Sequence, residues 1–271
     1  MNCHKDLPKG EKLKIVVWHV LVVVLAWWMW NTGQHATFNS VTGIDLNILP
    51  LSVFILLTAV VVMGYIMFRQ RRLSVTITAL IGLLFMVSFG WTWLNALAVL
   101  VLFGFNLWSA TRVRREINER RILNIPDAFY HGLMPVVLGL FVMISFAAYQ
   151  SPLLNEIKSA QKLPNQSQVF FRQIIDKTFG QKIEASTPQQ RNKLITEITS
   201  QTFQEFNSIL KPYFQYAPPV LAFSLFLILW GISFIFVWLG ILAGLILYWV
   251  LKKVNIIKIE KKEVQAEILV V

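Results

Sequence analysis

His19 is the first of the few side chains whose type and position could support chemistry. It is the only histidine well inside a long apolar run, which extends from Ile15 to Trp30, whereas His131 is at the start of a later one. Ionisable groups inside a membrane are rare and often functional. A neutral imidazole one turn into a helix, beside Trp18, is more often structural. We therefore interpret His19 as a polar contact within the membrane, with a functional role as the less favoured alternative.

Asn95 and Asn106 form the second candidate site. They are eleven residues apart, which corresponds to three helical turns, so both side chains share one face of a helix. Such a face could line a polar path or form hydrogen bonds to neighbouring helices. In lipid the second arrangement is the usual one. We therefore predict interhelical hydrogen bonds from both residues.

The remaining candidates for catalysis or metal binding are scattered. His4, His35 and His131 lie far apart, and Cys3 is the one cysteine. The sequence has no H-E-x-x-H motif, no cysteine pair, no phosphate-binding glycine loop and no G-x-S-x-G. We predict no metal, no cofactor and no enzymatic activity. The triplet from Asn165 to Ser167 matches a glycosylation sequon, but such triplets are common by chance.

The composition identifies the kind of molecule that must position these residues. Of 271 residues, 56% are apolar and 14% charged, and the mean hydropathy is +0.58. Soluble domains are about one quarter charged. Charged residues are absent from five apolar runs, at about 15–31, 49–68, 73–109, 130–149 and 218–251. The sequence therefore predicts an all-α, multi-pass membrane protein.

Two of these runs are too long for one crossing, because about 20 residues suffice to span a bilayer. The run 73–109 lies between two arginine clusters, and we expect helices near 74–90 and 93–109 with a turn after Gly90. The run 218–251 has two readings. Its length favours a hairpin broken near Gly231–Ser233, whereas the tail lysines favour a single tilted crossing. The total is seven crossings or six.

The charge pattern predicts the orientation of the chain. Of the 25 basic residues, 17 flank the apolar runs in four segments, which lie within 1–14, 69–72, 112–121 and 252–262. Basic flanks favour the cytoplasmic side. We predict an integral protein of the plasma (inner) membrane with a cytoplasmic N-terminus and 150–216 on the outer side. The pI of 9.9 therefore reflects insertion and gives no reason to expect a nucleic-acid partner.

The segment 110–125 has the pattern of a basic helix. Arg112 with Glu116 and Arg115 with Glu119 form pairs of opposite charge at i,i+4 spacing. These arginines could serve only to fix the topology, which is the favoured reading. Alternatively, they contact lipid headgroups. The candidates for headgroup contact are Arg112, Arg114, Arg115, Arg120 and Arg121.

The region 150–216 is predicted to form three helices on the outer side. The first starts at Ser151–Pro152 and ends before Pro164, the second covers about 166–179, and the third starts at the Thr187 cap and ends near Lys211. Their aromatic stripes are expected mainly to form a small core, with partner contact as the alternative. The residues concerned are Phe170, Phe171, Phe203 and Phe206.

We therefore divide the chain into a membrane domain (1–149, about five helices), an outer helical region (150–216), a membrane segment (217–251) and a charged tail (252–271). The favoured function is a non-enzymatic scaffold that binds an envelope partner through the outer region. The alternatives are a small transporter or oligomeric channel subunit, and an intramembrane enzyme, for which His19 lacks a partner. The expected partners are membrane lipids and either another protein or further copies of the chain.

Overall fold

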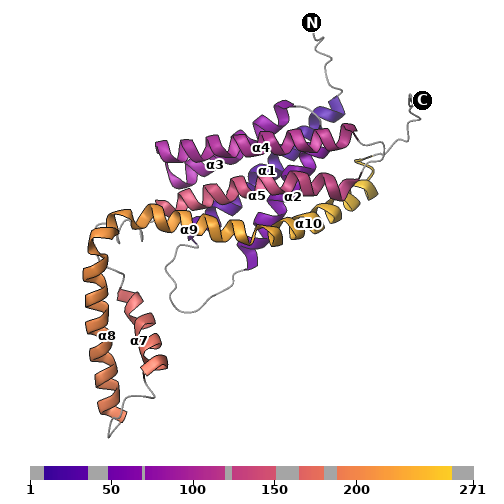
Figure 1. The fold of residues 1–271 in the computed structure, drawn as a ribbon. Coiled ribbons are helices and arrows are strands. Elements are labelled where there is room, and N and C mark those ends of the chain that lie inside the picture. The colour runs from indigo at the N-terminus through magenta and orange to yellow at the C-terminus, as the bar shows by residue number, and fades with distance from the viewer. Residues whose placement is uncertain are drawn as a thin grey trace, which may run out of the picture.

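The chain folds into a bundle of long helices with a helical hairpin at one end (Figure 1). The structure is a computed structural model that describes residues 9–35, 48–68, 71–119, 124–150, 165–179 and 188–257. Within these ranges every element is helical, as the sequence predicts. The elements are α1 (Lys9–His35), α2 (Ile48–Met67), α3 (Arg71–Phe89), α4 (Trp93–Glu119), α5 (Ile125–Tyr149), α7 (Asn165–Phe179), α8 (Pro188–Leu210), the 3-10 helix η1 (Lys211–Tyr216), α9 (Ala217–Gly231) and α10 (Ser233–Lys253).

Six of these helices are long and apolar enough to cross a membrane. They are α1 to α5 and α10. Each has 18 or more residues, and α4 is long enough to extend past the bilayer with its arginine-containing end. The chain therefore has the length and apolar character of a multi-pass membrane protein.

The split of the run 73–109 into two helices is confirmed. The turn lies at Gly90, whose φ of 94° is a backbone conformation that favours glycine. Trp91 and Trp93 flank the turn and are exposed. Tryptophans at this position are typical of a membrane–water interface.

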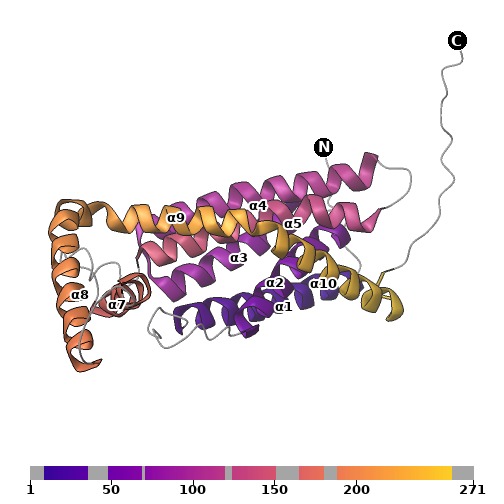
Figure 2. The ribbon, with the colours of Figure 1, turned by 60° about the horizontal axis from the view of Figure 1, so that its bottom comes forward.

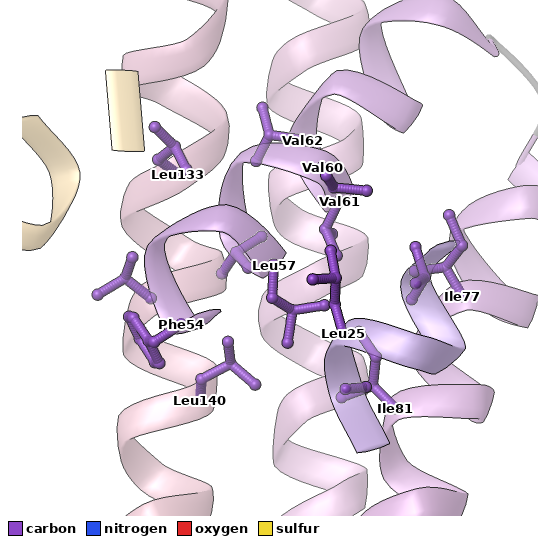
Figure 3. Close-up of a cluster of buried hydrophobic side chains, with 14 of the residues drawn as sticks. Leu25, Phe54, Leu57, Val60, Val61, Val62, Ile77, Ile81, Leu133 and Leu140 are labelled. Atoms are coloured by element: carbon purple, nitrogen blue, oxygen red, sulfur yellow. The ribbon is translucent and has the colours of Figure 1, made fainter. Parts of the chain in front are cut away.

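Helix α2 lies at the centre of the bundle, where it is packed on several sides. Figure 3 shows its apolar side chains between those of α1, α3 and α5. The buried residues labelled there are Leu25 of α1; Phe54, Leu57, Val60, Val61 and Val62 of α2; Ile77 and Ile81 of α3; and Leu133 and Leu140 of α5. Of the six candidate spans, α2 has the largest buried share, at 61%.

The last apolar run does not fold back on itself. A break at Ile232 separates α9 from α10, and both helices pack on α5, one after the other. Phe236 contacts the ring of Phe141 at 5.1 Å, and a Cβ on Gly244 would collide with the ring of Phe129. Successive residues thus contact α5 ever closer to its N-terminus. Figures 1 and 2 show α9 and α10 following one another end to end. The structure therefore contradicts a hairpin at 218–251 and agrees with the alternative in which the chain continues in one direction.

This path brings the last helix back to the end of the bundle where the first one begins. The Lys14 ammonium donates a hydrogen bond to the Ile256 carbonyl at 3.3 Å. At the same end, the start of α3 meets the end of α4 through Arg114 and Ser74, 3.2 Å apart. The basic residues of α1, α3, α4 and α10 therefore gather at one end, which we call the basic end.

Helices α7 and α8 form a hairpin at the opposite end, where α5 stops and α9 starts (Figures 1 and 2). Their bounds confirm the second and third helices predicted within 150–216. Across η1 the chain bends by 94° between residues 192–214 and 218–231. Helix α8 therefore runs across the bundle axis. The predicted helix from Ser151 to Leu163 lies outside the described residues.

Candidate functional site

Asn95 lies in a buried polar cluster at the end of the bundle opposite the basic end. Its Nδ2 donates to the carbonyl oxygens of Gly90, at 2.7 Å, and Phe89, at 3.2 Å. Its Oδ1 accepts a hydrogen bond from Nε2 of Gln150, whose Oε1 accepts from the Thr92 hydroxyl at 3.1 Å. The amide thus closes the turn between α3 and α4 and joins it to the end of α5.

Asn106 lies in a second polar cluster, nearer the basic end. Its Oδ1 accepts a hydrogen bond from the Tyr65 hydroxyl of α2 at 3.1 Å. One turn further along α4, the Ser109 hydroxyl donates to the Gly132 carbonyl of α5 at 2.7 Å. The Nδ2 of Asn106 has no hydrogen-bond partner in the part of the chain that the structure describes. Polar contacts thus join α4 to both α2 and α5.

The two asparagines share the buried face of α4, as their spacing predicts, yet their polar clusters are separate. Ala98 and Leu102 lie between them on that face, and both are fully buried. Apolar side chains therefore interrupt any polar path along this face. The sequence could not identify Tyr65 and Gln150 as partners, because each comes from another helix.

His19 connects α1 to α3. Its Nδ1 lies 2.7 Å from the Ile15 carbonyl oxygen, and its Nε2 lies 2.8 Å from the Thr76 hydroxyl. Since a carbonyl can only accept, Nδ1 donates to Ile15. The Thr76 hydroxyl beside Nε2 also lies 3.1 Å from the Leu73 carbonyl oxygen, to which it donates. Both nitrogens are engaged, which fits a positioning contact within the bundle.

Removal of the Tyr65 hydroxyl is expected to destabilise the bundle slightly. In Tyr65→Phe the Asn106 Oδ1 would lose its donor, and interhelical hydrogen bonds in membranes contribute about 0.6 kcal/mol, rarely above about 1.7. We expect a small, reproducible fall in the thermal unfolding midpoint of the purified protein. Tyr130→Phe, at an exposed tyrosine, is the control and should leave the midpoint unchanged. Equal midpoints for the two variants would show that the Tyr65–Asn106 contact does not contribute.

The arginines of α4 differ in their surroundings. Arg112 places its guanidinium 4.5 Å from the centroid of the Trp108 ring, and Arg115 pairs with Glu119 at 3.6 Å on an exposed surface. Arg114 instead turns toward Ser74 inside the bundle. Arg112 and Arg115 are thus exposed at the end of α4, whereas Arg114 is half-buried. Arg120 and Arg121 lie outside the described residues.

The α7–α8 hairpin has a small core of its own. Phe171 of α7 contacts Phe203 and Phe206 of α8, with ring centroids 5.7 and 5.3 Å apart. Ile175 and Ile195 are also buried there. Phe171 and Phe203 thus take the packing role that the sequence favours. Phe170 lies in α7, but its side chain is outside the described residues.

Helix α8 also carries apolar residues that its packing against α7 leaves exposed. We call these residues the apolar strip; they are Leu194, Ile198, Phe206 and Ile209. They lie within about 120° of the helix circumference at 100° per residue, an arc that also contains Thr202 and Glu205. Phe206 belongs to both surfaces, since it contacts Phe171 and is 42% exposed. The strip is therefore an apolar surface on the side of the hairpin.

The sites contain few groups that could perform a reaction. Across the described ranges there is no group of three or more His, Cys, Asp or Glu residues placed to hold a metal ion. His131 lies 4.0 Å from Glu116 at the basic end, far along α4 from the Asn95 cluster. Comparison of the chain with protein-family models, with curated proteins and with solved structures finds no match in any of the three. The arrangement of residues is therefore the sole basis for a function.

Proposed function

We propose that this protein is a non-enzymatic membrane scaffold that binds a helical segment of an envelope protein through its α7–α8 hairpin. The observation that carries the proposal is the apolar strip. The hairpin buries Phe203 and Ile195 in its own core and still leaves Leu194, Ile198 and Ile209 exposed. Apolar residues that remain exposed beside a small core are suited to contact a partner.

The position of the hairpin supports this role. Helix α8 packs against α7 and η1, and the 94° bend across η1 directs it across the end of the bundle. Figures 1 and 2 show the hairpin projecting from that end. A partner can therefore approach α8 without displacing a membrane helix.

The charges of the hairpin favour a protein over a lipid surface. Helices that lie on anionic membranes are rich in Lys and Arg. Helix α8 instead mixes Arg191 and Lys193 with Glu197 and Glu205, and uncharged polar residues are common in both helices. An apolar strip with mixed charges beside it fits the apolar face of another helix.

The proposed orientation places the hairpin on the outer side of the plasma membrane. Lys14, Arg72, Arg112 and Lys253 all belong to helix ends at the basic end. Basic helix ends are preferred in the cytoplasm. With one path for α9 and α10, the basic ends of α1, α3, α4 and α10 all lie on the proposed cytoplasmic side.

Site-specific cross-linking tests the proposal in intact membranes. A photoreactive amino acid at Ile198 is expected to give one discrete adduct. Mass spectrometry of this adduct should identify a peptide from a helical segment of a second protein. The same amino acid at Ser208, an exposed residue on the polar side of α8, should give little adduct. Similar adduct patterns from the two positions, or no adduct from Ile198, would contradict the proposed surface.

Substitutions within the strip provide a second test. Leu194→Glu with Ile198→Glu is expected to reduce adduct formation from position 209 by roughly tenfold or more, because a buried charge opposes an apolar contact. Gln204→Glu with Ser208→Glu is the matched control for added charge. An adduct with another copy of the chain would contradict an envelope partner and indicate that the protein self-assembles through the strip. Substrate flux in vesicles that survives without any adduct would instead favour the transporter or channel alternative.

A further inference from the structure

An apolar groove of about 420 Å³ opens between α5 and α9, at the end of the bundle opposite the basic end. The start of α4 closes one of its sides. Its lining includes Leu94 of α4; Val142, Phe146 and Tyr149 of α5; and Ala222 and Phe226 of α9. The hydroxyl of Ser145, which also lines the groove, already donates to the Phe141 carbonyl at 2.9 Å. The lining is therefore almost wholly apolar.

Small side chains and the helix break account for this space. Ala222 and Ser145 face the groove where larger residues would fill it. Helix α9 begins with Pro218 and Pro219 in its first turn and ends at the break near Ile232. It therefore packs on α5 as a short segment with its own direction, separate from the tighter contact that α10 makes through Gly240 and Gly244.

We propose that this groove binds one acyl chain of a membrane lipid. The surface around the groove continues onto the exposed apolar face of α9, which includes Val220, Phe223 and Leu227. In a bilayer this face contacts lipid tails, so an acyl chain can enter sideways without crossing water. A polar solute would lose its hydrogen bonds in such a lining, and water would find few partners there.

The polar groups at one end of the groove match the polarity of a lipid. Tyr149 lines the groove, and the next residue, Gln150, accepts a hydrogen bond from the exposed Thr92. Trp91 and Trp93 lie exposed at the same level of the bundle. Tryptophans of this kind mark the headgroup level. The headgroup therefore lies near Thr92 and Gln150, and the chain extends inward past Ala222 toward Phe226.

Photolabelling of the full-length protein tests the site. The purified chain is placed in phosphatidylcholine vesicles that contain a phosphatidylcholine with a diazirine in one acyl chain, then irradiated and digested. We expect lipid adducts concentrated on peptides from 142–149 and 219–226. Ala222→Phe fills the groove and should reduce these adducts roughly tenfold, as occlusion of a binding site does. Ile228→Phe places the same ring on the opposite, exposed face of α9 and should leave them unchanged.

Three results would overturn the proposal. They are equal labelling of the two variants, adducts spread evenly over exposed faces such as that of α1, and no adducts at 142–149 or 219–226. The last result would mean that protein covers the groove. Ala222→Leu gives a smaller filling if Ala222→Phe does not fold, which the thermal unfolding midpoint shows. Since the experiment contains no partner protein, its failure would leave the proposed role of the hairpin untouched.

Discussion

Adding one methyl group at Gly132 is expected to destabilise the helix bundle by about 2–3 kcal/mol, in the range of overpacked cores. An ideal Cβ there would lie 2.7 Å from a Val113 methyl of α4 and 2.7 Å from a Val62 methyl of α2. Both neighbours are β-branched, so neither can rotate away easily. The Gly132 carbonyl also accepts the Ser109 hydrogen bond, which holds the two helix backbones close together. The close approach of α2, α4 and α5 therefore depends on this glycine.

Thermal unfolding of Gly132→Ala in detergent or nanodiscs measures this effect. Gly104→Ala is the matched control, because a Cβ at Gly104 meets nothing within 4 Å. In the control, better helix propensity could even raise stability, by up to about 1 kcal/mol. If Gly132→Ala unfolded at or above the midpoint of Gly104→Ala, the three helices would not meet as described.

Phe203→Ala is expected to unfold the α7–α8 hairpin while the membrane helices stay folded. Truncation of a buried phenylalanine typically costs about 3–5 kcal/mol. A core as small as this one rarely supplies more than about 3–5 kcal/mol in total. Phe203 is 8% exposed and contacts Phe171, the central ring of α7. The loss should therefore remove most of the stability of the hairpin.

Hydrogen exchange resolves this expectation by region. Peptides from 165–179 and 188–210 should lose protection in Phe203→Ala, whereas peptides from α2 and α5 should keep it. Ile209→Ala removes an exposed apolar residue from the same helix and should preserve both sets. Retained protection of the hairpin would contradict its dependence on the Phe171–Phe203 contact. Loss of protection in α2 and α5 would show that hairpin and bundle fold as one unit.

The positions of the long helices follow largely from the sequence. Apolar runs free of charge locate α1, α2, α5 and α10, and the arginines on both sides of 73–109 require the split at Gly90. The course of 218–251 does not follow from length alone. Its two readings differ only in tertiary packing, namely whether the chain after Ile232 returns along α9 or continues along α5. The structure shows the continuation, which the lysine pattern favours.

The candidate sites could be predicted only in part. The spacing of Asn95 and Asn106 correctly places both on one buried face of α4. Their partners are Gln150, which follows α5 and is 55 residues from Asn95, and Tyr65 of α2, which is 41 residues from Asn106, so only the fold brings them together. The orientation of the arginines of α4 could not be predicted fully either. Arg112 and Arg114 are two residues apart and so point about 200° apart at 100° per residue, but the sequence does not say which side faces the bundle.

The topology is the central claim, because the scaffold role requires α8 and the end of the chain to lie on opposite sides of the membrane. The direct measurement labels single cysteines with a membrane-impermeant maleimide, in Cys3→Ser chains that carry either Gln201→Cys in α8 or a cysteine added after Val271. We expect labelling of position 201 in intact cells, and labelling of the added cysteine only after the cells are permeabilised. Labelling of both cysteines in intact cells would indicate that 218–251 crosses the membrane twice. Labelling of neither would indicate that α8 lies inside the cell. Either result would contradict the proposed topology.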